Sequence, residues 1–190
     1  MSDGGLIWRH VVINTKSSWL PGDPRGFRNR KHRIHSSGDY RNPPPKGEHA
    51  GLYRYNLKQS ASPVHIPVEF RASIGQEIVL FLKERSMEVL AISVGSTHCH
   101  FLAKLPESRA EAMTFVGKLK NIVSYKVKDR MPGGIWSRGA TLKPILKQDH
   151  HRQTYVYIAT RQEKGTWVWL FDEGKSLPGV LRKSTAHATA

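Results

Sequence analysis

The sequence predicts an α+β domain, in which an antiparallel sheet carries two helices on one face and a further helix lies near the C-terminus. Short β-branched runs alternate along the chain with segments whose apolar residues recur at helical spacing. Their order is strand, helix, strand, strand, helix and a strand-like segment, which is the order of a ferredoxin-like sandwich. A chain of 190 residues, 38% of them hydrophobic, is long enough for one such domain with its own core.

The first half of this sandwich is predicted from local pattern. Residues 7–15 are β-branched, form a short run and are closed by polar residues, as expected for a strand. Residues 68–85 carry apolar side chains at helical spacing, and Pro67 is well placed to begin the helix. Two compact apolar runs, 87–94 and 98–105, are predicted to be the next two strands, with a Gly-Ser turn between them.

The second half follows in the same way. Ser108 is expected to cap a helix that runs to residue 130, where a Pro-Gly-Gly triplet follows. Residues 135–146 are punctuated by Gly and Pro and predict an irregular or short-strand segment. Residues 148–163 are predicted to form the C-terminal helix, and residues 166–171 a short strand.

The charge of the chain indicates the class of its partner. There are 30 Lys and Arg residues against 15 Asp and Glu residues, which gives a formal net charge of +15. Such an excess repels itself unless a polyanion is near, and the phosphate backbone of nucleic acid is the commonest polyanion. A membrane partner is disfavoured because no predicted helix sets a strong apolar face against a purely basic one. No apolar run approaches the roughly 20 residues of a transmembrane helix.

The compartment is predicted from two further features. The N-terminus lacks the apolar stretch of a secretory signal. The single cysteine, Cys99, excludes a disulfide within the chain and fits a reducing environment. We therefore expect a cytoplasmic protein.

The pattern predicts one domain over residues 1–173 and a flexible tail over residues 174–190. Residues 16–67 form an irregular insertion that is rich in turn-forming residues and has little periodicity. Between Arg25 and Lys46 this insertion holds seven Lys or Arg residues and one acidic residue. Because loops of this length are uncommon in compact domains, the insertion is either a nucleic-acid-contacting element or a solvated basic segment.

The residues with the clearest chemical signal lie in the third predicted strand. Alternate side chains of a strand share a face, so His98 and His100 point to one side, and Cys99 points to the other with Phe101. Two imidazoles about 7 Å apart at their Cα atoms can both reach one divalent ion. The alternative is a partly exposed strand end that binds no metal. A zinc site is disfavoured because Cys99 faces away, whereas two imidazoles with an oxygen ligand and water suit Mg²⁺ or Mn²⁺.

In these features the chain resembles the single-tyrosine HUH transposases, which include the REP-associated tyrosine transposases of bacteria. That family has a His-hydrophobic-His strand in a ferredoxin-like sheet, and here His98-Cys99-His100 follows the run EVLAISV. A lysine-bearing helix comes next, here with Lys118 and Lys120, and then a C-terminal helix with a Tyr-Ile pair, here Tyr157-Ile158. The opening INTKSSWLPGDPRG is also similar to a segment of many members, so that the resemblance spans roughly residues 11–169.

The resemblance implies a chemistry and a set of partners. A Mg²⁺ or Mn²⁺ ion on His98 and His100 would polarise a phosphate of single-stranded DNA, and Tyr157 would attack it to leave a 5′-phosphotyrosine and a free 3′-OH. The implied partner is single-stranded DNA that contains a hairpin, and the implied location is the bacterial nucleoid. The resemblance leaves both a monomer and a homodimer as candidates for the active form. The DNA contacts that we predict are Arg25, Arg28, Arg30, Lys31, Lys118, Lys120 and Arg161.

Three tyrosines compete for the role of nucleophile. Tyr155 and Tyr157 lie about 160° apart around a helix, so only one of them can face the metal. The Tyr-Ile match selects Tyr157. Tyr125 lies within the second predicted helix, where a surface aromatic is the expected interpretation.

The chain departs from the family at the third metal ligand. Members usually carry Gln or Asn one helical turn after the tyrosine, whereas this chain has Arg161, a cation that binds phosphate rather than metal. We predict that Gln162 completes the site, with Gln153 on the preceding turn as the alternative. Arg161 also favours a second hypothesis, a hairpin-binding or single-strand-binding protein with weakened catalysis. A third, an RNA-binding domain of the same topology, is disfavoured because no strand has the aromatic-rich pattern of such domains.

Overall fold

The computed structural model describes residues 5–27, 34–38 and 42–171. Three of the predicted DNA contacts, Arg28, Arg30 and Lys31, lie outside the described residues, as does the predicted tail over residues 174–190. Within the described ranges no helix is long and apolar enough to cross a lipid bilayer.

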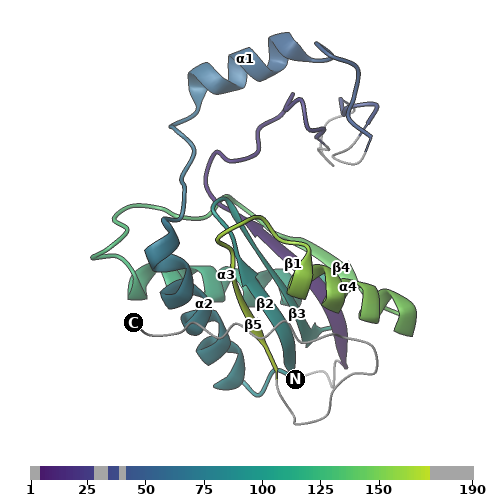
Figure 1. Ribbon diagram of the computed structural model, residues 1–190, viewed down its shortest axis with the longest axis vertical. Coiled ribbons are helices and arrows are strands. Elements are labelled where there is room, and N and C mark those ends of the chain that lie inside the picture. Colours follow the sequence, from purple (N-terminus) through teal and green to yellow (C-terminus); the bar gives the residue numbers. More distant parts are fainter. Residues whose placement is uncertain (1–4, 28–33, 39–41, 172–190) are drawn as a thin grey trace, which may run out of the picture.

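One sheet forms the centre of the molecule (Figure 1). Its strands are β1 (Leu6–Asn14), β2 (Val89–Val94), β3 (His98–Pro106), β4 (Thr141–Pro144) and β5 (Trp167–Leu170). The spatial order is β4-β1-β3-β2-β5, and every neighbouring pair is antiparallel. The first four strands therefore have the arrangement of a ferredoxin-like sandwich, and β5 extends the sheet beside β2.

The helices cover both faces of the sheet. Two of them, α2 (Val68–Lys83) and α3 (Arg109–Lys126), precede β2 and β4 and pack on one face. On the other face lies α4 (Gln148–Thr160), against β2 and β3. The predicted fold class is confirmed, including the additional C-terminal helix that carries Tyr157.

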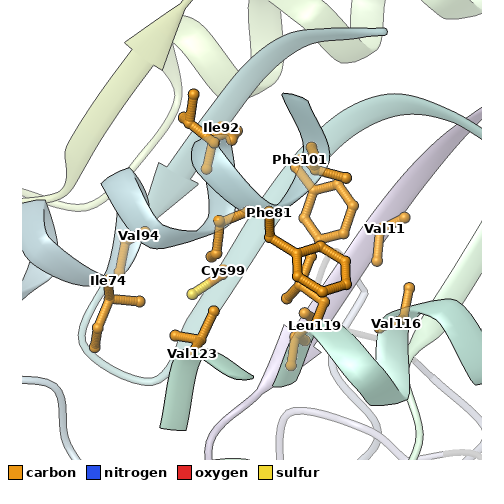
Figure 2. Close-up of a cluster of buried hydrophobic side chains, with 14 of the residues drawn as sticks. Val11, Ile74, Phe81, Ile92, Val94, Cys99, Phe101, Val116, Leu119 and Val123 are labelled. Atoms are coloured by element: carbon orange, nitrogen blue, oxygen red, sulfur yellow. The ribbon is translucent and has the colours of Figure 1, made fainter. Parts of the chain in front are cut away.

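The main core lies between the sheet and the α2–α3 layer. Figure 2 shows Phe81 of α2 and Leu119 of α3 against Phe101 and Cys99 of β3, all of them buried. A smaller second cluster lies on the opposite face, where Leu102 of β3 meets apolar side chains of α4. The predicted alternation along β3 is thus confirmed, because odd-numbered residues enter the main core and even-numbered ones face α4.

Helix boundaries differ from the predicted ones by a few residues. Ser108 is the N-cap of α3, as predicted, and its hydroxyl accepts a hydrogen bond from the Glu111 backbone N–H. That helix ends at Lys126 and not at residue 130, and turns fill the remaining distance. The C-terminal helix ends at Thr160 and not at residue 163, and beyond its end Gln162 Nε2 donates to the carbonyl oxygen of Tyr157 at 2.8 Å.

The insertion over residues 16–67 is less irregular than we predicted. It contains a helix, α1 (Ala50–Gln59), in which no residue is buried. A solvated helix of ten residues has no apolar stripe against a core, which explains why periodicity failed to reveal it. In Figure 1 this helix stands away from the sheet, at the end where the chain leaves β1.

Candidate functional site

Three histidines and one tyrosine converge on the sheet face that α4 covers. Strand β3 supplies His98 and His100, and the antiparallel neighbour β1 supplies His10, whose register partner is Leu102. Helix α4 supplies Tyr157. The His100 ring centroid lies 4.8 Å from that of His98, 5.2 Å from that of His10 and 5.3 Å from that of Tyr157.

The three imidazoles are held in their neutral form. Burial lowers the pKa of His10 to about 4, with smaller contributions from the nearby Lys143 and His150. Burial also lowers the pKa of His98 and, more strongly, the pKa of His100. Because a neutral imidazole keeps a lone pair on one nitrogen, these rings are suited to bind a metal at neutral pH.

A divalent ion fits this group of side chains. His100 Nδ1 is 3.0 Å from Nε2 of His10, whereas His100 Nε2 is buried and has no hydrogen-bond partner in the described part of the chain. An unpartnered buried ring nitrogen is costly unless a ligand takes it. The described residues contain no group of three or more His, Cys, Asp or Glu side chains able to hold a metal. An ion on His98 and His100 would therefore complete its shell with amide or water oxygens, as Mg²⁺ and Mn²⁺ do.

The predicted third ligand and its alternative occupy different places. Gln153 lies on α4, one turn before Tyr157, and lines the same cavity as the two histidines. Gln162 donates its amide to the Tyr157 carbonyl, and Arg161 beside it lines the cavity. The role of either glutamine as a ligand stays a prediction.

The cavity around these residues is large and basic. Its volume is about 1170 Å³, and it lies between the sheet face, α4 and the loop that follows β1. Four permanent cations line it against one carboxylate, Asp149; the cations are Arg25, Lys143, Arg152 and Arg161. Such a surface attracts phosphate groups and stabilises negative charge that develops on oxygen.

The structure places the three tyrosines in different surroundings. Tyr157 lines the cavity beside His100. Tyr155 is buried in the second core cluster with Leu102 and Ile158. Tyr125 lies on α3, which packs on the opposite face of the sheet, and is 66% exposed. Of the three, only Tyr157 shares the cavity with the histidines.

Two solved structures match most of the chain. One is a REP-associated tyrosine transposase bound to a REP hairpin, with a TM-score of 0.44, 15% sequence identity and coverage of 83% of this chain and 67% of that one. The other is a candidate transposase from Deinococcus radiodurans R1, with a TM-score of 0.43, 14% identity and coverage of 85% and 95%. No protein-family model and no curated protein matches the chain.

The predicted DNA-contacting residues divide into two sets. Arg25 and Arg161 line the cavity. Lys118 and Lys120 belong to α3, on the other face of the sheet, and are not brought to the site. The ammonium group of Lys120 is partly buried, which lowers its pKa, and donates to the Ser137 and Gly139 carbonyls at 2.6 and 2.8 Å. It therefore positions the loop before β4.

Several cavity residues were missed by sequence reasoning, and His10 and Trp19 are two of them. His10 lies on β1, and no local pattern in the sequence specifies that β1 pairs with β3. The spacing of two residues indicates only that His10 and Val12 share one face of the strand. Trp19 belongs to the motif WLPGDPRG, whose only signal in the sequence is its similarity to a segment of the transposase family. Its indole lines the cavity beside Arg25. By contrast, Trp136, Trp167 and Trp169 are partly buried against the main core.

Proposed function

We propose that this protein cleaves and rejoins single-stranded, hairpin-containing DNA through a 5′-phosphotyrosine on Tyr157. The observation that carries the proposal is the convergence of Tyr157 with His98 and His100 in one basic cavity. The order of the sequence motifs, which resembles that of single-tyrosine HUH transposases, supports the same chemistry. The hairpin as a substrate feature is carried over from that resemblance.

In the proposed reaction the phenolic oxygen of Tyr157 attacks the phosphorus atom of one DNA phosphodiester. The bond from phosphorus to the 3′ oxygen breaks, this oxygen leaves with a proton as a 3′-OH, and the 5′ phosphate stays on the tyrosine. A later attack by a 3′-OH on the phosphotyrosine reverses these steps and joins two strands. Free tyrosine has a pKa near 10, so the loss of its proton needs a positive environment. Arg161 and Lys143 supply part of that environment.

His98 and His100 are the residues that would hold a metal in this cavity. When bound, Mg²⁺ or Mn²⁺ would act as a Lewis acid that polarises an oxygen of the scissile phosphate. Arg152 and Arg161 would bind phosphate oxygens and neutralise their charge. His10 would keep the His100 ring in place through its 3.0 Å hydrogen bond.

The proposal is tested with labelled hairpin oligonucleotides, drawn from the DNA that flanks the gene, in the presence of Mn²⁺. We expect a covalent DNA–protein adduct on a denaturing gel. It should be lost with EDTA, with His100→Ala and with Tyr157→Phe, because each removes one participant in the reaction. Tyr125→Phe is the matched control, because it deletes the same hydroxyl from the opposite face of the sheet and should leave the adduct unchanged.

Two results would contradict the proposal. An adduct that survives Tyr157→Phe would move the nucleophile to another residue. No adduct on a hairpin that the protein binds would indicate a binding protein without cleavage activity.

A further inference from the structure

The loop that follows β1 holds an aromatic side chain at the edge of the cavity. Trp19 is 41% exposed, although its indole Nε1 donates to the Gly26 carbonyl at 2.8 Å. The guanidinium carbon of Arg25 lies 4.3 Å from the centroid of the indole ring, so the two groups stack. A large apolar side chain is thus held in a fixed orientation without being buried.

Arg25 is itself fixed by a buried carboxylate. Asp23 is 2% exposed and accepts hydrogen bonds from Arg25 Nε at 2.8 Å and from Nη2 at 2.5 Å. Arg25 Nη2 also donates to the Ser18 carbonyl at 2.8 Å. Burying a carboxylate against a half-exposed cation contributes little net stability. The ion pair instead holds the guanidinium plane in one orientation, and the indole that stacks on it is held as well.

The insertion helix supports the loop from the outside. Gly22 has a φ of +88°, and a Cβ there would lie 2.5 Å from the backbone nitrogen of Tyr53 in α1. The side-chain amide of Asn56, also in α1, donates to the Pro21 carbonyl at 3.3 Å. These contacts with α1 support the loop that presents Trp19.

We propose that Trp19 and Arg25 form a binding subsite for one unpaired nucleobase of single-stranded DNA, next to the phosphate that Tyr157 attacks. The base stacks on the indole, and the guanidinium contacts the neighbouring backbone. Trp19 and Arg25 line the same cavity as His98, His100 and Tyr157, so the base and the reacting phosphate share one cavity. Every base has a π-face, so the subsite tolerates any sequence but requires an unstacked base. The identity of the ligand as DNA rests on the proposed function.

The test separates base contacts from backbone contacts. Binding of the full chain to fluorescent oligothymidylate, which has no secondary structure, is compared with binding to an abasic sugar-phosphate oligomer of the same length. We expect Trp19→Ala to weaken oligothymidylate binding by about 5- to 140-fold, which corresponds to the loss of one base–aromatic stack. Affinity for the abasic oligomer should not change, because it depends on phosphates alone.

Three further variants sharpen the comparison. Trp19→Phe keeps an aromatic face and should retain most of the preference for the base-bearing oligomer. Trp19→Leu keeps apolar bulk without that face and serves if the alanine variant does not unfold cooperatively. Tyr125→Ala is the matched control, because Tyr125 also stacks with a cation, Lys128, at 4.4 Å but lies on α3. It should bind both oligomers as the unmodified protein does.

The outcomes distinguish this subsite from the proposed cleavage activity. An equal loss for both oligomers, or no loss for either, would overturn the subsite. A covalent adduct with unaltered base preference in Trp19→Ala would overturn the subsite alone. A base preference that depends on Trp19, in a protein that forms no adduct, would support the subsite and contradict cleavage.

Discussion

The contact between His10 and His100 couples the protonation of the two rings, and with it the nitrogen of His100 that is available to a ligand. Both rings are neutral at neutral pH, because burial lowers both pKa values, and each ring therefore carries one N–H. His100 Nε2 keeps a lone pair only if His100 Nδ1 carries the proton and donates it to His10 Nε2, 3.0 Å away. Partners of this kind orient a metal-binding histidine and raise its basicity.

We accordingly expect His10→Ala to weaken Mn²⁺ binding by about 10- to 100-fold. Titration calorimetry on the protein without DNA measures this directly. His10→Gln should restore part of the affinity, because its amide oxygen can accept the same N–H. His150→Ala is the control, since His150 lines the cavity from α4. Unchanged Mn²⁺ affinity in His10→Ala would show that His100 needs no partner for its orientation.

At the scale of elements, β5 is attached to the fold through a glycine of α2. Gly75 is buried, and a Cβ at that position would lie 1.9 Å from the indole ring of Trp167 in β5. The indole therefore occupies the space that any other side chain would fill. Because β5 pairs with β2, this contact joins the added edge strand to the α2 layer.

Gly75→Ala should destabilise the protein by about 1–3 kcal/mol, since overpacking outweighs the better helix propensity of alanine. The free energy of unfolding in urea measures it. Gly117→Ala is the matched control, because Gly117 lies within α3 and a Cβ there meets nothing within 4 Å. That variant should gain up to about 1 kcal/mol. A stabilised Gly75→Ala protein would mean that β5 does not pack on α2 in solution.

For the whole molecule the dominant property is its net charge of +15. The cavity concentrates four cations near Tyr157, whereas α3 presents its lysines on the other face of the sheet. Binding to single-stranded DNA releases about 0.7 counterions per neutralised phosphate, so the logarithm of affinity falls linearly with the logarithm of salt concentration. The slope of this line is proportional to the number of phosphates that the protein's cations neutralise.

Lys143→Gln should reduce the magnitude of that slope by about 0.7, because Lys143 lines the cavity. Lys118→Gln removes an equal charge from α3 and should leave the slope unchanged. Both are measured by fluorescence anisotropy of a labelled oligonucleotide over a salt series. Equal effects of the two substitutions would show that the DNA path also includes α3, as the sequence resemblance suggested.

Local periodicity predicted the fold class and the face of the sheet on which the two candidate histidines lie. The alternation in β3 placed His98 and His100 on one face because the side-chain period of a strand is two. The angle between successive helical residues put Tyr155 and Tyr157 on different sides of a helix, and the structure places Tyr155 in the core. These two inferences needed only the geometry of one element at a time, whereas the choice of Tyr157 came from the family resemblance.

The tertiary structure decided which separate elements meet. His10 reaches His100 through the β1–β3 register, and Trp19 reaches the cavity through a loop supported by a helix that shows no periodic signal. The partners of Lys120 were set in the same way, because its ammonium group donates to carbonyl groups of the loop before β4. Strand register, loop path and side-chain partners depend on contacts between residues far apart in the chain, so no local pattern in the sequence specifies them.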